Sequence, residues 1–182
     1  SDLVTVATCF NSLFVTGTAV FIYFAVCRLY DKQHGMLVLL ITLFTTPLYL
    51  QSAIYYTDSA SMFFTSLTFY LVVCAVKADT KIKSVVIQIL LGITAFVGFE
   101  TKLTTFILII ALVIYALYRG FSPAEVKKVF IAFISFAVMF TAFTVAKNAV
   151  YDSELSDRYQ YPPEHWIMMG LNGVGGFSLD DC

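Results

Sequence analysis

The stretch "LVTVATCFNSLFVTGTAVFIYFAVC", residues 3–27, contains no Asp, Glu, Lys or Arg. A helix needs about 20 mostly apolar residues to cross the hydrocarbon core of a membrane. Charge-free windows continue through the chain at 33–57, 59–76, 84–99, 103–118 and 129–146. Hydrophobic residues make up 59% of the chain and charged residues 13%, whereas soluble domains carry about 25% charged residues. The sequence therefore predicts an all-α polytopic membrane protein.

We interpret these windows as about six transmembrane helices. The predicted spans are 3–27, 33–57, 59–76, 84–99, 103–118 and 129–149. The fourth and fifth windows are short, about 24 Å of helix each, so we expect a tight hairpin, with a re-entrant pair as the alternative. Residues 1–149 would form the bundle, and residues 150–182 would begin an exterior segment.

The basic residues predict the orientation of these spans. Eight of the eleven lie on one side if the spans alternate: Arg28, Lys32, Lys77, Lys81, Lys83, Arg119, Lys127 and Lys128. Basic residues favour the cytoplasmic side, so the N-terminus and the segment after Lys147 are expected outside. An outside N-terminus without a signal-peptide pattern suggests a piece of a longer protein. The net charge of −1 gives no indication of a nucleic-acid partner.

The predicted outer face carries the candidate site. Asp58 lies between the second and third spans, and Glu100 and Lys102 lie in the turn of the hairpin. Charges near the membrane surface are costly unless they are paired or used. An acid there can act as a general base or hold a divalent metal that bridges phosphate oxygens, and Lys102 can meet the anionic headgroup of a membrane lipid. The alternatives are side chains that only snorkel to the interface, or a pair between Glu100 and Lys102.

Two further residues are candidates for substrate contact on this face. Gln51 lies one turn below the outer end of the second span. His165, the only histidine predicted outside, can exchange protons or donate a hydrogen bond to phosphate. The alternative for His165 is an interfacial aromatic cluster with Trp166. Ser122, followed by Pro123, is typical of the start of a helix.

Three segments resemble the GT-C fold glycosyltransferases, most closely bacterial relatives of the protein O-mannosyltransferases (glycosyltransferase family 39). They are "PLYLQSAIYYTDSASMFF", "GFETKLTTFILIIA" and "PPEHWIMMGLNGVGGFS". The resemblance matches Asp58 to an exterior acidic position, and Lys102 and Thr104 to a Lys-x-Thr motif. The family's principal acid lies in a first exterior loop that has no counterpart here, so the chain would be a partial bundle.

This resemblance implies a bacterial plasma-membrane enzyme with its site on the extracytoplasmic face. It would transfer a sugar from a polyprenyl-phosphate donor to a glycan, lipid or protein acceptor, inverting the anomeric centre. Asp58 would assist catalysis, and Lys102, Glu100, His165 and Gln51 would contact substrate. The alternatives from other classes are a transporter or lipid-flippase segment, and a structural membrane subunit without chemistry.

Overall fold

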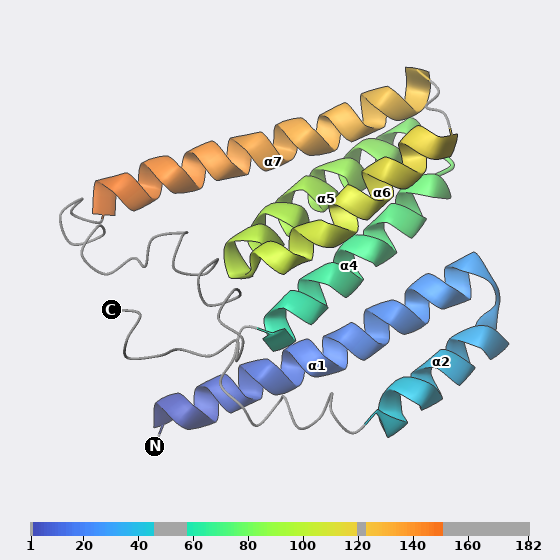
Figure 1. The fold of residues 1–182 in the computed structure, drawn as a ribbon, viewed down its shortest axis with the longest axis vertical. Coiled ribbons are helices and arrows are strands. Elements are labelled where there is room, and N and C mark those ends of the chain that lie inside the picture. Colours follow the sequence, from blue (N-terminus) through green and yellow to red (C-terminus); the bar gives the residue numbers. More distant parts are fainter. Residues whose placement is uncertain (1, 46–57, 120–122, 151–182) are drawn as a thin grey trace, which may run out of the picture. The chain divides into compact units, whose positions relative to one another are not determined.

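The computed structural model describes residues 2–45, 58–119 and 123–150, in which every regular element is a helix (Figure 1). The elements are α1 (Asp2–Leu29), α2 (Lys32–Phe44), α4 (Asp58–Val76), α5 (Lys81–Thr101), the 3₁₀ turn η2 (Leu103–Thr105), α6 (Phe106–Arg119) and α7 (Pro123–Val150). The predicted all-α class is confirmed. The chain divides into two compact units, Ser1–Phe140 and Thr141–Cys182.

Four of the described helices are long and apolar enough to cross a membrane. They are Thr5–Leu29, Asp58–Val76, Lys81–Thr101 and Val126–Val150. The helices Lys32–Phe44 and Leu103–Tyr115 are apolar but shorter. The predicted span 33–57 begins in α2 and continues outside the described residues, so the total of six spans stays a prediction.

The helix α5 is longer than the charge-free window 84–99 that predicted it. Its 21 residues correspond to about 31 Å, close to the thickness of the hydrocarbon core. The helix includes Lys81, Lys83 and Glu100 near its ends, because charged side chains at a helix end can extend to the membrane surface. The fourth span is therefore of full length, and only α6 keeps the expected shortness.

Polar side chains define where two of the helices begin. The Asp31 carboxylate accepts hydrogen bonds from the His34 backbone N–H and from His34 Nδ1, both at 2.9 Å, and caps α2. These bonds lower the pKa of the Asp31 carboxyl, the backbone bond contributing most. Thr80 caps α5 by accepting from the Lys83 N–H at 3.3 Å. The helix α7 begins at Pro123, as predicted, while Ser122 lies outside the described residues.

The helices α1 and α4 pack in parallel. Phe14 lies 5.3 Å from Phe63 between ring centroids, and Phe24 lies 6.2 Å from Tyr70, so positions advance together along both helices. Parallel helices end at the same face of a membrane. The predicted alternation of spans requires such a parallel pair, while residues 46–57 between them lie outside the described structure.

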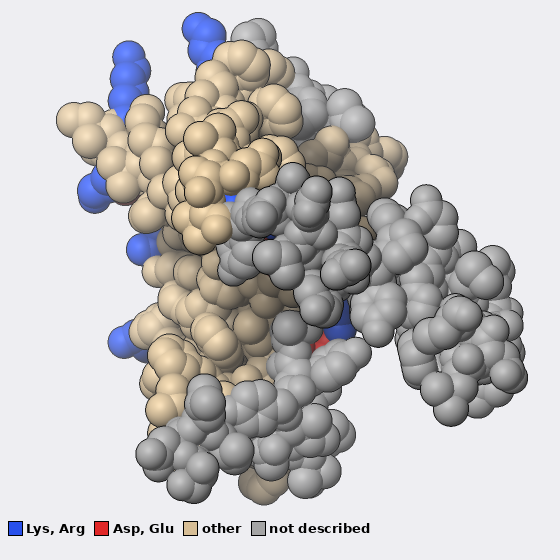
Figure 2. Space-filling model, turned by 90° about the vertical axis from the view of Figure 1, so that its left-hand side faces the viewer, with Lys and Arg blue, Asp and Glu red and all other residues tan. Residues whose placement is uncertain are grey.

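Small residues let the helices approach closely, as is common in membrane bundles. The α5 helix meets α7 at Gly92, where an added Cβ would lie 2.4 Å from the Ala132 carbonyl oxygen. Nearby, the Ser135 hydroxyl donates to the Ile89 carbonyl at 3.0 Å. Figure 2 shows that the described surface in view carries few charges, most of them Lys and Arg side chains along one margin. An exposed surface of this composition suits a lipid environment.

Candidate functional site

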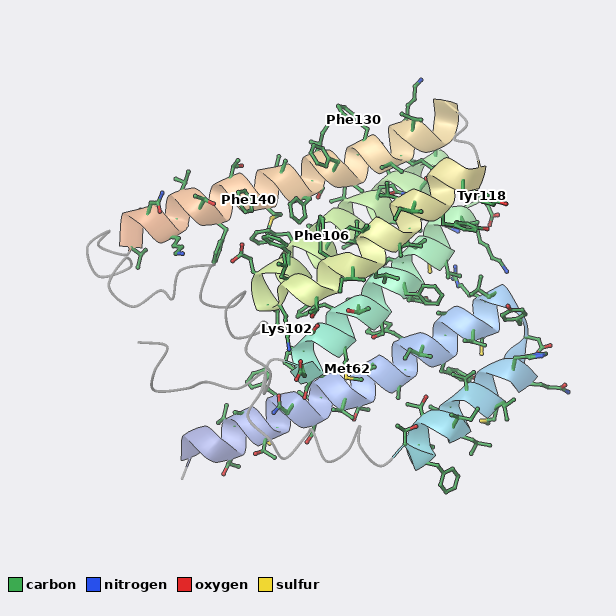
Figure 3. The ribbon with its side chains drawn as sticks, viewed as in Figure 1. Met62, Lys102, Phe106, Tyr118, Phe130 and Phe140 are labelled. Carbon is green, nitrogen blue, oxygen red and sulfur yellow. The ribbon has the colours of Figure 1, made fainter. Side chains whose placement is uncertain are left out.

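Asp58 and Lys102, 44 residues apart in sequence, form an ion pair. Asp58 is the first residue of α4, and Lys102 is the C-cap residue of α5. Figure 3 shows Lys102 extending from the end of α5 to the first turn of α4. Each charge is also placed favourably for its own helix, the acid at an N-terminus and the base at a C-terminus. Asp58, which has no charged residue near it in the sequence, is therefore paired with Lys102 in the structure.

The pair is held half-buried at one end of the bundle. The side chain of Lys102 is 31% exposed and that of Asp58 37% exposed. A polar ligand can therefore reach both groups, although neighbouring residues cover most of their surface. Isolated exposed ion pairs contribute little to stability. The position of the Asp58–Lys102 pair is therefore a better indication of function than its contribution to stability.

Hydroxyl groups beside the pair join the same two segments. The Ser61 hydroxyl lies 3.1 Å from that of Thr105 and 3.4 Å from that of Thr104. Thr105 is 1% exposed and Ser61 8% exposed, whereas Thr104 is exposed. The buried bond between Ser61 and Thr105 fastens η2 to α4, one turn along each segment from the ion pair. This bond holds Lys102 within reach of Asp58.

Gly98 makes room for that arrangement. A Cβ at this position would lie 2.6 Å from Thr105 Cγ2 and 3.1 Å from Phe64 Cβ. The Gly98 carbonyl also accepts the backbone N–H of Lys102 at 2.9 Å, where the chain leaves α5 in an extended conformation. A glycine with no side chain therefore lets the turn after α5 fold back against α4.

Of the other predicted site residues, Glu100 lies in the described part of the chain and takes no part in the ion pair. Glu100 lies exposed in the last turn of α5. Lys102 pairs with Asp58 instead of with Glu100, so the considered pair between Glu100 and Lys102 is not formed. Gln51 and His165 lie outside the described residues. Their predicted contacts with substrate stay predictions.

The residues around Asp58 do not by themselves make a metal site. Within the described part of the chain, no three His, Cys, Asp or Glu residues gather closely enough to hold a metal ion. The one acid of the cluster already faces a cation, the Lys102 ammonium. A divalent metal at Asp58 would need ligands from beyond residues 2–45, 58–119 and 123–150.

Sequence reasoning missed the buried members of the cluster, which are Ser61, Gly98 and Thr105. A signal was present in the spacing, because Ser61 follows Asp58 by three residues and Thr105 follows Lys102 by three. Residues three apart lie on the same side of a helical turn. The sequence does not reveal that the polar side of α4 faces the polar side of the turn that contains Lys102 and Thr105.

Comparison with models of known protein families finds a match for the chain that carries this cluster. A family model described as "conserved hypothetical integral membrane protein" matches residues 6–182. The chain belongs to this family. Its membership, together with the long apolar helices, makes the chain a multi-pass membrane protein. Searches of the curated proteins and of the solved structures found no match.

Proposed function

We propose that this integral membrane protein forms part of a glycosyltransferase that uses a polyprenyl-phosphate-linked sugar. The acceptor would be a glycan, lipid or protein at the extracytoplasmic face of a bacterial plasma membrane. The observation that carries the proposal is the Asp58–Lys102 pair, which brings an acid and a base together at one end of the membrane helices. A phosphate linked to a lipid chain lies at the same depth, the boundary between hydrocarbon and water.

The two charges suit the two ends of a sugar transfer, provided that the bound substrate separates the pair, which the structure holds in direct contact. An acceptor hydroxyl would attack the anomeric carbon from one side while the bond to the lipid phosphate breaks on the other. Asp58 would accept the proton of the hydroxyl as a general base, or would assist a second carboxylate that accepts it. The Lys102 ammonium would stabilise the negative charge that grows on the leaving phosphate. Bond formation and cleavage on opposite sides would invert the anomeric centre.

The position of the charges favours surface chemistry over passage through the membrane. Transporters place ionisable groups near the bilayer midplane, on interrupted helices. In α4 the only charged residue is Asp58, its first residue, and in α5 the charged residues are Lys81, Lys83 and Glu100, near its two ends. The middle of both helices therefore lacks the groups that an ion-coupled transporter needs.

The test is transfer of radiolabelled sugar from polyprenyl-phosphate donors in membranes that contain the full chain. We expect transfer by the wild type and at least a hundredfold loss in Asp58→Asn and in Lys102→Ala, the range typical of lost acid–base or charge-stabilising groups. Asp31→Asn is the matched control, because it removes a carboxylate from an exposed helix cap. Wild-type rates in both site variants would refute the roles given to these residues, and no transfer by the wild type would refute the enzyme.

A charge-exchanged variant separates chemistry from packing. Asp58→Lys combined with Lys102→Asp can restore the ion pair with its polarity reversed. If the pair acted only as a clamp, this variant would regain both thermal stability and transfer. We expect it to regain only part of the stability relative to the single variants, because each exchanged charge now opposes the dipole of its own helix. It should remain without transfer, because acid and base have exchanged places.

A further inference from the structure

A second pair of charged residues lies at the opposite end of α4, and both are basic. Lys77 Nζ donates to the backbone carbonyl oxygen of Arg28. The Arg28 guanidinium lies over the Tyr70 ring, with Cζ 5.9 Å from its centroid. Both side chains are exposed. These contacts place two basic residues at the same end of the bundle, where α1 and α4 end.

Two like charges at the same end of packed helices repel each other, and here no described acid compensates them. Within the described residues, neither Arg28 nor Lys77 forms an ion pair. Asp31, the nearest acid along the chain from Arg28, is bonded to His34. Asp79, two residues after Lys77, is exposed and lies beyond ion-pair distance of either base. An anion that bridged the two bases would relieve their repulsion.

The place of this cluster indicates which anion it meets. The 19 residues of α4 correspond to about 28 Å, nearly the thickness of the hydrocarbon core. Because Asp58 starts the helix and Lys77 follows its end, the two basic residues lie at the membrane surface opposite the Asp58–Lys102 pair. The positive-inside rule makes that surface cytoplasmic, and the cytoplasmic leaflet is the one rich in anionic lipids.

We propose that Arg28 and Lys77 form a binding site for the phosphate of an anionic phospholipid in the cytoplasmic leaflet. The guanidinium presents a planar set of donors that suits phosphate oxygens. The Tyr70 ring and the Arg28 carbonyl hold the two donating groups in place before the lipid arrives. The site is separate from the Asp58–Lys102 cluster, and the proposal does not depend on sugar transfer.

The test compares the full chain in nanodiscs and by native mass spectrometry, with phosphatidylglycerol and phosphatidylcholine as probes. We expect the wild type to retain phosphatidylglycerol preferentially. Combining Arg28→Gln with Lys77→Gln should weaken that retention on the order of a hundredfold, the loss expected for two charge-assisted hydrogen bonds to phosphate. The control combines Lys81→Gln with Lys83→Gln, which removes the same charge from exposed positions at the same face. Equal loss in the control would show diffuse attraction and overturn the site.

A second measurement uses only the wild type, so its result does not depend on whether a variant folds. Amine-reactive labelling of Lys77 should fall in phosphatidylglycerol nanodiscs relative to phosphatidylcholine nanodiscs, while labelling of Lys81 and Lys83 changes less. Unchanged labelling of Lys77 would overturn the proposal. If inorganic phosphate protected Lys77 equally well in phosphatidylcholine nanodiscs, the ligand would be a soluble phosphate and the lipid proposal would be wrong.

Discussion

At the scale of single residues, the buried hydroxyl of Thr105 is the part of the candidate site that energetics can test most directly. It bonds to Ser61 from a fully enclosed position, while the neighbouring Thr104 is exposed. Replacing either threonine by valine keeps the shape of the side chain. In Thr105→Val the Ser61 hydroxyl loses its closer partner inside the bundle, and an unsatisfied buried group costs about 1–3 kcal/mol.

We therefore expect Thr105→Val to lower the free energy of unfolding by about 1–3 kcal/mol and Thr104→Val to change it by less than about 0.5 kcal/mol. Reversible unfolding of the protein in mixed detergent micelles measures both. Thr105→Ser keeps the hydroxyl and should recover part of the loss. Equal effects of the two valine variants would mean that the bond to Thr105 does not fasten η2 to α4.

Sequence reasoning at this scale found the charged residues of the site but not their arrangement. Asp58 and Lys102 could be named because charges are rare in an apolar chain. Their pairing could not be predicted, because the sequence between them leaves the rotation of α4 and α5 open. The resemblance placed Thr104 in the expected Lys-x-Thr motif, whereas in the structure Thr105 makes the buried contact.

At the scale of elements, windows without charges located the helices better than they located the helix ends. The helix α5 includes Lys81, Lys83 and Glu100, because a charge near the surface does not stop a helix. Its real start is the Thr80 cap, a local hydrogen bond. The shorter α2 and α6 agree less well with a simple rule of about 20 residues per span.

Close packing between helices gives a prediction at this scale. A methyl group at Gly92 would meet the backbone oxygen of Ala132 at 2.4 Å, and one at Gly17 would meet the Phe63 ring at 2.5 Å. A ring can turn away, but the backbone of α7 has to move as a whole. We expect Gly92→Ala to destabilise the protein by about 1–3 kcal/mol, the usual range for overpacking, and Gly17→Ala to destabilise it less.

The readout is a disulfide crosslink between Ile89→Cys and Ser135→Cys, in a background without the native cysteines. Their parent residues are joined by a hydrogen bond in the structure, so the crosslink reports the contact of α5 with α7. It should form in the parent and in Gly17→Ala, and form more slowly in Gly92→Ala. A crosslink rate unchanged by Gly92→Ala would contradict the close packing of these helices.

At the scale of the whole molecule, the two charged clusters lie at opposite ends of α4. Asp58 and Lys102 meet at one end of α4, and Lys77 and Arg28 meet at the other. Sequence alone predicted this polarity from the distribution of lysine and arginine. The parallel packing of α1 on α4 is compatible with alternating spans, while the orientation in the membrane stays a prediction.

The topology can be measured with one helix as its own control. Glu100 lies in the last turn of α5 and Lys83 in its first, and both are exposed. If α5 crosses the membrane, a thiol reagent that cannot cross should label Glu100→Cys from outside and Lys83→Cys only after the membrane is opened. Glu100 is a better position for the label than Asp58, because Asp58→Cys would break the ion pair.

The reverse pattern of labelling would place the proposed catalytic cluster in the cytoplasm and the basic cluster outside, which would contradict both proposals at once. Labelling of both positions from one side would show that α5 does not span. The proposals for sugar transfer and for lipid binding therefore rest on the same orientation, and this experiment tests that orientation without depending on either activity.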